Sequence, residues 1–81
     1  MEEKIMPQYA DKYDEETLIS QYEMIRKSGA CNMFDYPCVQ NAAGQFELDE
    51  LEEFIREEER KGYSVLLMNF SALCKKYKIQ Q

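Results

Sequence analysis

The sequence predicts an all-α fold, a compact small domain of about four short helices, and three observations support this. Apolar residues recur at helical spacing in separate stretches of the chain. Residues that cap helices precede these stretches, and glycines follow them. With 81 residues, 44% of them apolar, the chain can bury one thin core. We therefore expect an N-terminal arm, residues 1–13, followed by a single helical domain, residues 14–81.

The first helix is predicted over residues 15–28. Asp14 precedes it as an N-cap, and acidic residues fill the first turn, where the helix dipole favours negative charge. Gly29 follows the last turn and is typical of a C-terminal stop. The arm before this helix shows no sustained period, so it either frays or packs on the domain through Ile5, Met6 and Tyr9.

The second helix is predicted over 36–43 and the third over 47–61, with Gly44 and Gly62 as their stops. Asp35 can cap the second helix. Tyr36 is the alternative cap, because the residue before a proline resists helical angles. The third helix carries one apolar stripe, formed by Leu48, Leu51, Phe54 and Ile55.

The last segment is open to two interpretations. Residues 63–70 could form a buried strand by composition, but a lone strand would have no partner in the chain. A helical stripe sustained over four turns instead favours a helix over 64–77 with Ser64 as its cap. Apolar residues wrap more than half of this helix, so we expect it to be central to the domain or covered by a partner, for instance in a homo-oligomer.

The turn between the first two helices contains a structural motif. Asn32 and Asp35 are expected to hold the turn and cap the next helix, while Met33 and Phe34 insert into the core. The predicted core consists of Phe34, Leu51, Ile55, Leu66 and Phe70.

The chain has three cysteines and no histidine. We expect reduced thiols, with Cys38 and Cys74 buried as small core residues. A zinc site needs about four closely spaced Cys or His ligands, so no metal and no cofactor is expected. No Ser–His or Cys–His nucleophile pair can form, so we expect no catalytic residue; an active site built from carboxylates alone is the remaining enzymatic alternative.

The net charge of −6 is concentrated in particular segments, and residues 47–61 hold eight acidic against three basic side chains. Such a helix repels phosphates, which disfavours direct nucleic-acid binding and favours a basic protein surface as partner. The plain alternative is a solvated face that keeps a small protein soluble. The candidate partner-binding residues are Glu47, Asp49, Glu50, Glu53 and Glu57, with Tyr9, Tyr13, Tyr36 and Tyr63 as candidate exposed anchors.

A helix-turn-helix regulator is a second functional hypothesis, because helices 36–43 and 47–61 are joined by a tight turn. Its recognition helix would begin Glu47-Leu48-Asp49-Glu50 and would present carboxylates to the phosphates of DNA. The charge therefore weighs against this hypothesis.

Residues 28–57 carry the patterns S-G-x-x-N-M-F-D, V-Q-x-x-A and E-L-x-x-F-I. This block resembles a short protein family of unknown function that occurs in bacteriophages and prophages. Glu47 departs from the family, which has a glycine there. The resemblance implies a phage or mobile-element origin and an uncharacterised role. Together with the acidic helix, it favours an accessory protein that binds a host or phage protein. The sharper form of this hypothesis is an inhibitor that occupies a basic nucleic-acid groove of a host defence or transcription enzyme. No apolar run suggests a membrane span or a secretion signal, so we expect the bacterial cytoplasm.

Overall fold

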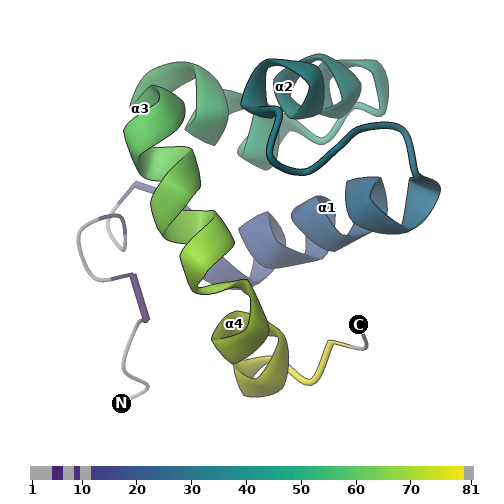
Figure 1. Ribbon diagram of the computed structural model, residues 1–81. Helices are drawn as coiled ribbons and strands as arrows, with labels where there is room; N and C mark the ends of the chain where they lie inside the picture. The colour runs from purple at the N-terminus through teal and green to yellow at the C-terminus, as the bar shows by residue number, and fades with distance from the viewer. Residues whose placement is uncertain (1–4, 7–8, 10–11, 80–81) are drawn as a thin grey trace.

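Four helices make up the fold in the computed structural model, which describes residues 5–6, 9 and 12–79 (Figure 1). They are α1 (Glu15–Ser28), α2 (Tyr36–Gln45), α3 (Asp49–Met68) and α4 (Phe70–Lys76). The central helix is α3, which packs against α1, α2 and α4. The described residues contain no strand, so the all-α prediction is confirmed and the strand alternative for residues 63–70 is wrong. None of the helices in these ranges is long and apolar enough to cross a bilayer.

Helix α1 has the predicted bounds because both of its ends are encoded locally. The Asp14 carboxylate accepts a hydrogen bond from the Thr17 N–H at 3.3 Å. At the other end, Gly29 adopts a left-handed conformation with φ 71°, and its N–H donates to the Arg26 carbonyl at 3.3 Å.

Helix α2 begins as predicted but ends later. Asp35 is the N-cap, since its carboxylate accepts from the Cys38 N–H at 3.3 Å. The predicted stop at Gly44 is wrong: the helix continues to Gln45, and Glu47 is the left-handed residue with φ 60°. The Leu48 N–H donates to the Ala43 carbonyl at 2.8 Å, which completes a Schellman motif with Glu47 at the position that glycine normally occupies.

Helix α3 starts at Asp49, and α1 supplies its N-terminal cap. Leu48 provides no side-chain cap; instead the Gln21 side-chain oxygen accepts from the Leu51 N–H at 2.8 Å. Because Gln21 lies 30 residues away, sequence spacing could not indicate this cap. The predicted start at residue 47 is therefore two residues early.

The predicted boundary between the third and fourth helices is wrong in position. Helix α3 is kinked at Glu59, with φ 55° and ψ −150°, and Gly62 and Ser64 lie inside the helix after the kink. A second interruption falls at Asn69, whose side-chain amide donates to the Val65 carbonyl at 2.8 Å and so satisfies one of the last carbonyls of α3. The second part of α3 then descends to α4 in Figure 1.

The core lies where α3 crosses α1 and α2, and the predicted core residues Leu51, Ile55 and Leu66 are fully buried there. Phe70 is partly buried. The prediction for Phe34 is wrong, because 81% of this residue is exposed. Tyr63 is buried next to the turn, and its hydroxyl donates to the Met33 carbonyl at 2.6 Å. Met33 is partly buried, so one half of the predicted inward pair is correct.

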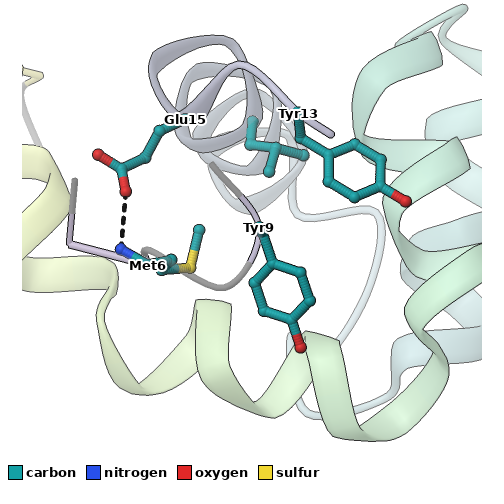
Figure 2. A pocket seen from close by; sticks show the side chains of 5 residues that line it. Met6, Tyr9, Tyr13 and Glu15 are labelled. Carbon is teal, nitrogen blue, oxygen red and sulfur yellow. Dashed lines mark hydrogen bonds between the residues drawn. The ribbon is translucent and has the colours of Figure 1, made fainter. Parts of the chain in front are cut away.

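The described part of the N-terminal arm packs on the helices, as one of the two alternatives expected. Met6 is buried, and its N–H donates to the Glu15 carboxylate at 2.9 Å (Figure 2). Tyr9 and Tyr13 both contact the Phe54 ring edge-on, with centroids 5.2 and 5.1 Å away. Residues 1–4, 7–8 and 10–11 of the arm lie outside the described ranges.

Candidate functional site

The acidic residues predicted to bind a partner lie at one end of α3 and just before it. Glu50, Glu53 and Glu57 are spaced three and four residues apart, so they share one face of α3 before its kink; we call these three residues the acidic stripe. Glu53 and Glu57 are exposed, and Glu50 is half-buried. Glu47 and Asp49 are also exposed, the first at the left-handed end of α2 and the second as the first residue of α3.

An open hollow of about 270 Å³ lies beside the acidic stripe. Its walls are Glu53 and Glu57 on α3 and Lys12 and Tyr13 from the segment that precedes α1. The hollow is therefore built by two segments that are about 40 residues apart in the sequence, and the sequence carries no periodic signal that joins them.

The charged side chains that line the hollow have a net negative charge, because Glu53 and Glu57 contribute two carboxylates and Lys12 contributes one ammonium group. The Tyr13 hydroxyl donates to the Glu58 carboxylate at 3.4 Å. Burial, together with the negative charges of Glu58, Glu57 and Glu53, raises the pKa of Tyr13 to about 12, so its phenol is neutral at physiological pH. The same carboxylate charges that raise the pKa of this phenol would attract a cation.

Two basic side chains partly neutralise the negative charge around the hollow. Lys12 lies 3.4 Å from the Glu58 carboxylate, and the Lys12 side chain is 66% exposed. Arg56 pairs with Glu52 at 3.4 Å and with Glu57 at 3.8 Å. Within the described part of the chain, no cation pairs with the first two members of the acidic stripe, Glu50 and Glu53. The negative charge of the stripe is thus only partly compensated.

A buried carboxylate elsewhere in the molecule has a structural role that sequence reasoning missed. Glu15 accepts hydrogen bonds from the Met6 N–H, from Lys76 at 3.0 Å and from the Tyr77 hydroxyl at 2.6 Å. Burial alone would raise the pKa of Glu15, but these hydrogen bonds and the Lys76 charge outweigh it and lower the pKa. Glu15 therefore ties the N-terminal segment and the C-terminal residues to α1 as an ionised carboxylate.

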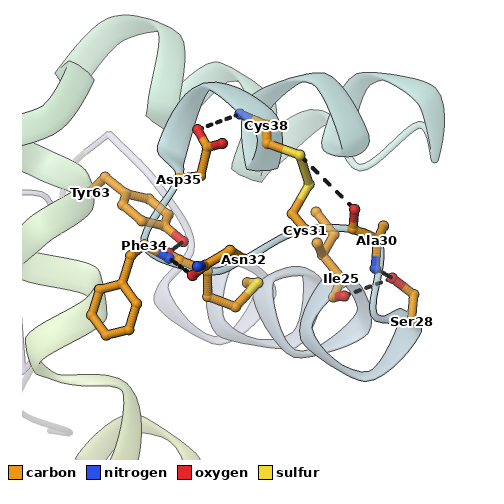
Figure 3. Close-up of a disulfide and its surroundings, with 10 residues drawn as sticks. Ile25, Ser28, Ala30, Cys31, Asn32, Phe34, Asp35, Cys38 and Tyr63 are labelled. Carbon is orange, nitrogen blue, oxygen red and sulfur yellow. Dashed lines mark hydrogen bonds between the residues drawn. A yellow bond between two sulfur atoms is a disulfide. The ribbon is translucent and has the colours of Figure 1, made fainter.

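The expectation of three reduced thiols is wrong. Cys31 and Cys38 form a disulfide between the α1–α2 turn and the first turn of α2 (Figure 3). The turn and the Asp35 cap bring their Cα atoms to 5.9 Å, within the usual range for disulfides. Cys38 is accordingly half-exposed rather than a core residue. Cys74 is a buried free thiol, as predicted, and burial followed by the charge of Glu23 raises its pKa.

The remaining predicted side chains are divided between the surface and the interior. Asn32 and Asp35 hold the turn as expected, because the Asn32 side chain accepts from the Phe34 N–H at 3.0 Å and Asp35 caps α2. Of the four tyrosines predicted as exposed anchors, Tyr13 and Tyr63 are buried, and Tyr9 and Tyr36 are partly buried. In the described ranges, no three Cys, Asp or Glu side chains are placed to hold a metal ion together.

Comparison with known proteins gives one match. Neither a curated protein nor a solved structure matches the chain. Residues 14–69, which run from the N-cap of α1 to the end of α3, match the family DUF5049, described as a domain of unknown function. This match covers well over half of the sequence and contains the turn motif, the disulfide and the acidic stripe. The chain therefore belongs to the DUF5049 family.

Proposed function

We propose that this protein is a small accessory protein that binds a basic protein surface through the acidic stripe. The observation that carries the proposal is the hollow beside the stripe, where Glu53 and Glu57 form one wall and Lys12 and Tyr13 the other. The Lys12 ammonium group lies 3.4 Å from the Glu58 carboxylate, which leaves Glu53 and Glu57 to attract a partner's cation. An acidic helix with no hollow beside it would keep the protein soluble equally well. The hollow adds a place where one cationic side chain of a partner can lie close to two carboxylates.

A lysine or arginine of the partner fits this chemistry. Its charge would lie near the carboxylates of Glu53 and Glu57, the two acidic residues that line the hollow. Because the hollow is open, the incoming charge keeps part of its hydration, which limits the desolvation cost of the ion pair. Glu50, one turn earlier on the same face, extends the contact to a second basic group.

The resemblance to a phage and prophage family supports a more specific form of the proposal. In that form the protein acts in a bacterial host and blocks a groove of a defence or transcription enzyme that normally holds nucleic acid. Such grooves are lined by Lys and Arg, the side chains that the acidic stripe would attract. The helix-turn-helix alternative gains no support, because Asp49, Glu50 and Glu52 occupy the first turn of α3, where a recognition helix would approach phosphates.

The test uses a triple variant, Glu50→Gln with Glu53→Gln and Glu57→Gln, which removes three charges and keeps side-chain shape. Wild type and variant are used as baits in a bacterial lysate, and the captured protein is then purified for direct binding measurements. We expect the variant to capture at least about tenfold less of a basic protein.

A matched control separates local charge from net charge. Glu16→Gln, Ser71→Lys and Ala72→Lys change the net charge by the same amount at exposed positions on α1 and α4. This control variant should capture the partner as wild type does. Equal loss of capture by both variants, or by neither, would contradict a role for the acidic stripe.

A further inference from the structure

The turn between α1 and α2, residues 29–35, is here called the Phe34 loop (Figure 3). It is held by short-range polar contacts: the Ala30 N–H donates to the Ser28 hydroxyl at 3.2 Å, and the Asp35 N–H donates to the Asn32 carbonyl at 2.9 Å. The Tyr63 hydroxyl donates to the Met33 carbonyl at 2.6 Å and so ties the loop to α3. Phe34 at its tip points away from the disulfide and is 81% exposed, so it adds little to the stability of the loop.

The Cys31–Cys38 disulfide is the covalent tie of this loop. It closes a ring from the middle of the loop to the first turn of α2, with a sequence separation of seven residues. Both cysteines are half-exposed, so a small thiol or disulfide reagent can approach them. Neither is part of the buried core, which is formed by residues of α1, α2, α3 and α4 and by Met6, Tyr13 and Leu48.

We propose that the Cys31–Cys38 disulfide is a redox-reversible clamp: its formation fixes the Phe34 loop against α2, and its reduction frees the loop while the helical core stays folded. The half-exposed position of both cysteines supports reversibility. Cys31 packs against the buried core but is not one of the residues that form it. In reducing compartments, disulfides that do form are generally transient and redox-responsive. The clamp does not depend on the proposed binding function.

The exchange balances with a small-molecule disulfide such as oxidised glutathione as the oxidant. One protein thiolate attacks a sulfur of the reagent, forms a mixed disulfide and releases one glutathione thiolate. The second protein thiolate attacks the protein sulfur of that mixed disulfide, which forms the Cys31–Cys38 bond and releases the second glutathione. The two protein thiols lose two electrons, the reagent gains them, and the two protons are taken up by the glutathione thiolates.

Fixing the loop has a consequence for Phe34. A large aromatic side chain on an ordered loop loses less conformational entropy on docking than one on a mobile loop. The oxidised form would therefore present Phe34 already ordered to a partner with an apolar pocket, and the reduced form would present it at a greater entropic cost.

The first experiment equilibrates the full-length chain in glutathione buffers from fully reduced to fully oxidised, starting from either form. Free thiols are then tagged with a maleimide under native conditions and counted by mass. We expect two tags to disappear together as the buffer becomes oxidising and to reappear as it becomes reducing. Cys74 is an internal control, because its buried thiol should stay untagged until the chain is unfolded.

The second experiment measures backbone amide exchange in the oxidised and reduced forms. Reduction should speed exchange of the loop amides, Cys31 to Phe34, at least about tenfold, while the amides of Leu51 to Ile55 change less than about twofold. A variant with Cys31→Ser and Cys38→Ser should behave as the reduced form in every buffer.

Three results would overturn the proposal. A bond that survives millimolar reduced glutathione under native conditions would be a permanent staple. Loss of protection in α3 on reduction would make the disulfide part of the fold itself. Equal amide exchange rates in the loop of the oxidised and reduced forms would mean that the disulfide does not order the Phe34 loop.

Discussion

Three residues other than glycine have positive φ in the described chain: Glu47, Glu59 and Lys78. Glu47 and Lys78 follow the last turns of α2 and α4 and end them in the same way. In each case the next N–H, from Leu48 or Ile79, donates at 2.8 Å to the carbonyl five residues earlier. A Cβ atom in this conformation costs about 1–2 kcal/mol, which is why glycine is the usual residue there.

Replacing Glu47 by glycine should therefore stabilise the protein. The substitution relieves the left-handed backbone but makes the unfolded chain more flexible, so we expect a net gain of about 0.5–1 kcal/mol. Thermal unfolding should shift upward by about 2–8 °C. Gly29→Ala is the control of opposite sign: φ is 71° and no atom lies within 4 Å of the added methyl, so only the backbone term acts and stability should fall. A lower melting temperature for Glu47→Gly would contradict this reading of the helix end.

The exposure of Phe34 gives a second prediction at the residue scale. Phe34→Ala should change the free energy of unfolding by less than about 0.5 kcal/mol, because the residue is mostly exposed and buries little apolar surface. Ile55→Ala, at a site that is 1% exposed, should cost about 2–5 kcal/mol. Urea unfolding of the two variants measures both costs. A cost above about 2 kcal/mol for Phe34→Ala would show that Phe34 packs in the core, which would contradict its exposed position.

Glu15 predicts a specific pH dependence. Its pKa is lowered in the folded state, so its ionised form stabilises the fold above the unfolded-state value near 4.5, and this contribution is lost as pH falls through the folded pKa. Glu15→Gln should cost about 1–3 kcal/mol at pH 7, and the difference from wild type should shrink below about pH 4.5. Urea unfolding at several pH values measures this, with Glu16→Gln, an exposed neighbour, as control. A difference that is constant from neutral to acidic pH would show that the charge of Glu15 contributes nothing.

Among the helix ends, those formed by a nearby capping side chain or by a left-handed glycine could be predicted from the sequence, whereas the end of α2 at the left-handed Glu47 could not. Both ends of α1 and the start of α2 are formed by caps within three residues, and they are correct. The start of α3 depends on Gln21, and its kink lies at Glu59, where no local signal favours a break. The prediction that Gly62 ends a helix is wrong, because Gly62 lies inside α3, where the lack of a side chain allows Glu58 and Tyr9 to approach closely.

Gly62 and Gly44 test that distinction. A Cβ at Gly62 would collide with the Glu58 side chain and lie 3.3 Å from the Tyr9 hydroxyl, so Gly62→Ala should destabilise the protein by about 1–3 kcal/mol. A Cβ at Gly44, inside α2, meets only the Glu52 side chain at 3.9 Å, so Gly44→Ala should stabilise by about 0.5–1 kcal/mol through helix propensity. Thermal unfolding of both variants should give opposite signs; equal signs would mean that Gly62 is an ordinary helical glycine.

At the scale of the whole molecule, the fold class and the acidic helix could be predicted, but the site could not. Periodicity and capping act within a few residues, and they indicate the helices and the run of carboxylates. The hollow needs Lys12 and Tyr13 beside Glu53 and Glu57, and the disulfide needs the geometry of the turn; both arise only from packing. The inward position expected for Phe34 is wrong for the same reason: next to the turn it is Tyr63 from α3 that is buried, with its hydroxyl bonded to the Met33 carbonyl, while Phe34 is exposed.

The charge layout of the molecule follows from the same packing. The first part of α3 carries the acidic stripe, whereas Lys27, Lys75 and Lys78 are exposed near the ends of α1 and α4. A basic partner would therefore be drawn toward one end of the molecule, and the attraction would act at a distance comparable with the Debye length, about 8–10 Å at physiological salt.

Binding through the acidic stripe is tested by the association rate constant with the captured partner, measured as ionic strength rises from about 20 mM to about 500 mM. Wild type should associate about five- to tenfold faster than the Glu50→Gln, Glu53→Gln, Glu57→Gln variant at the lowest salt, because electrostatic steering acts mainly on this rate. The two rates should converge as salt screens the charges. Equal association rates at about 20 mM salt would contradict binding through the acidic stripe, which would then serve only to keep the protein soluble.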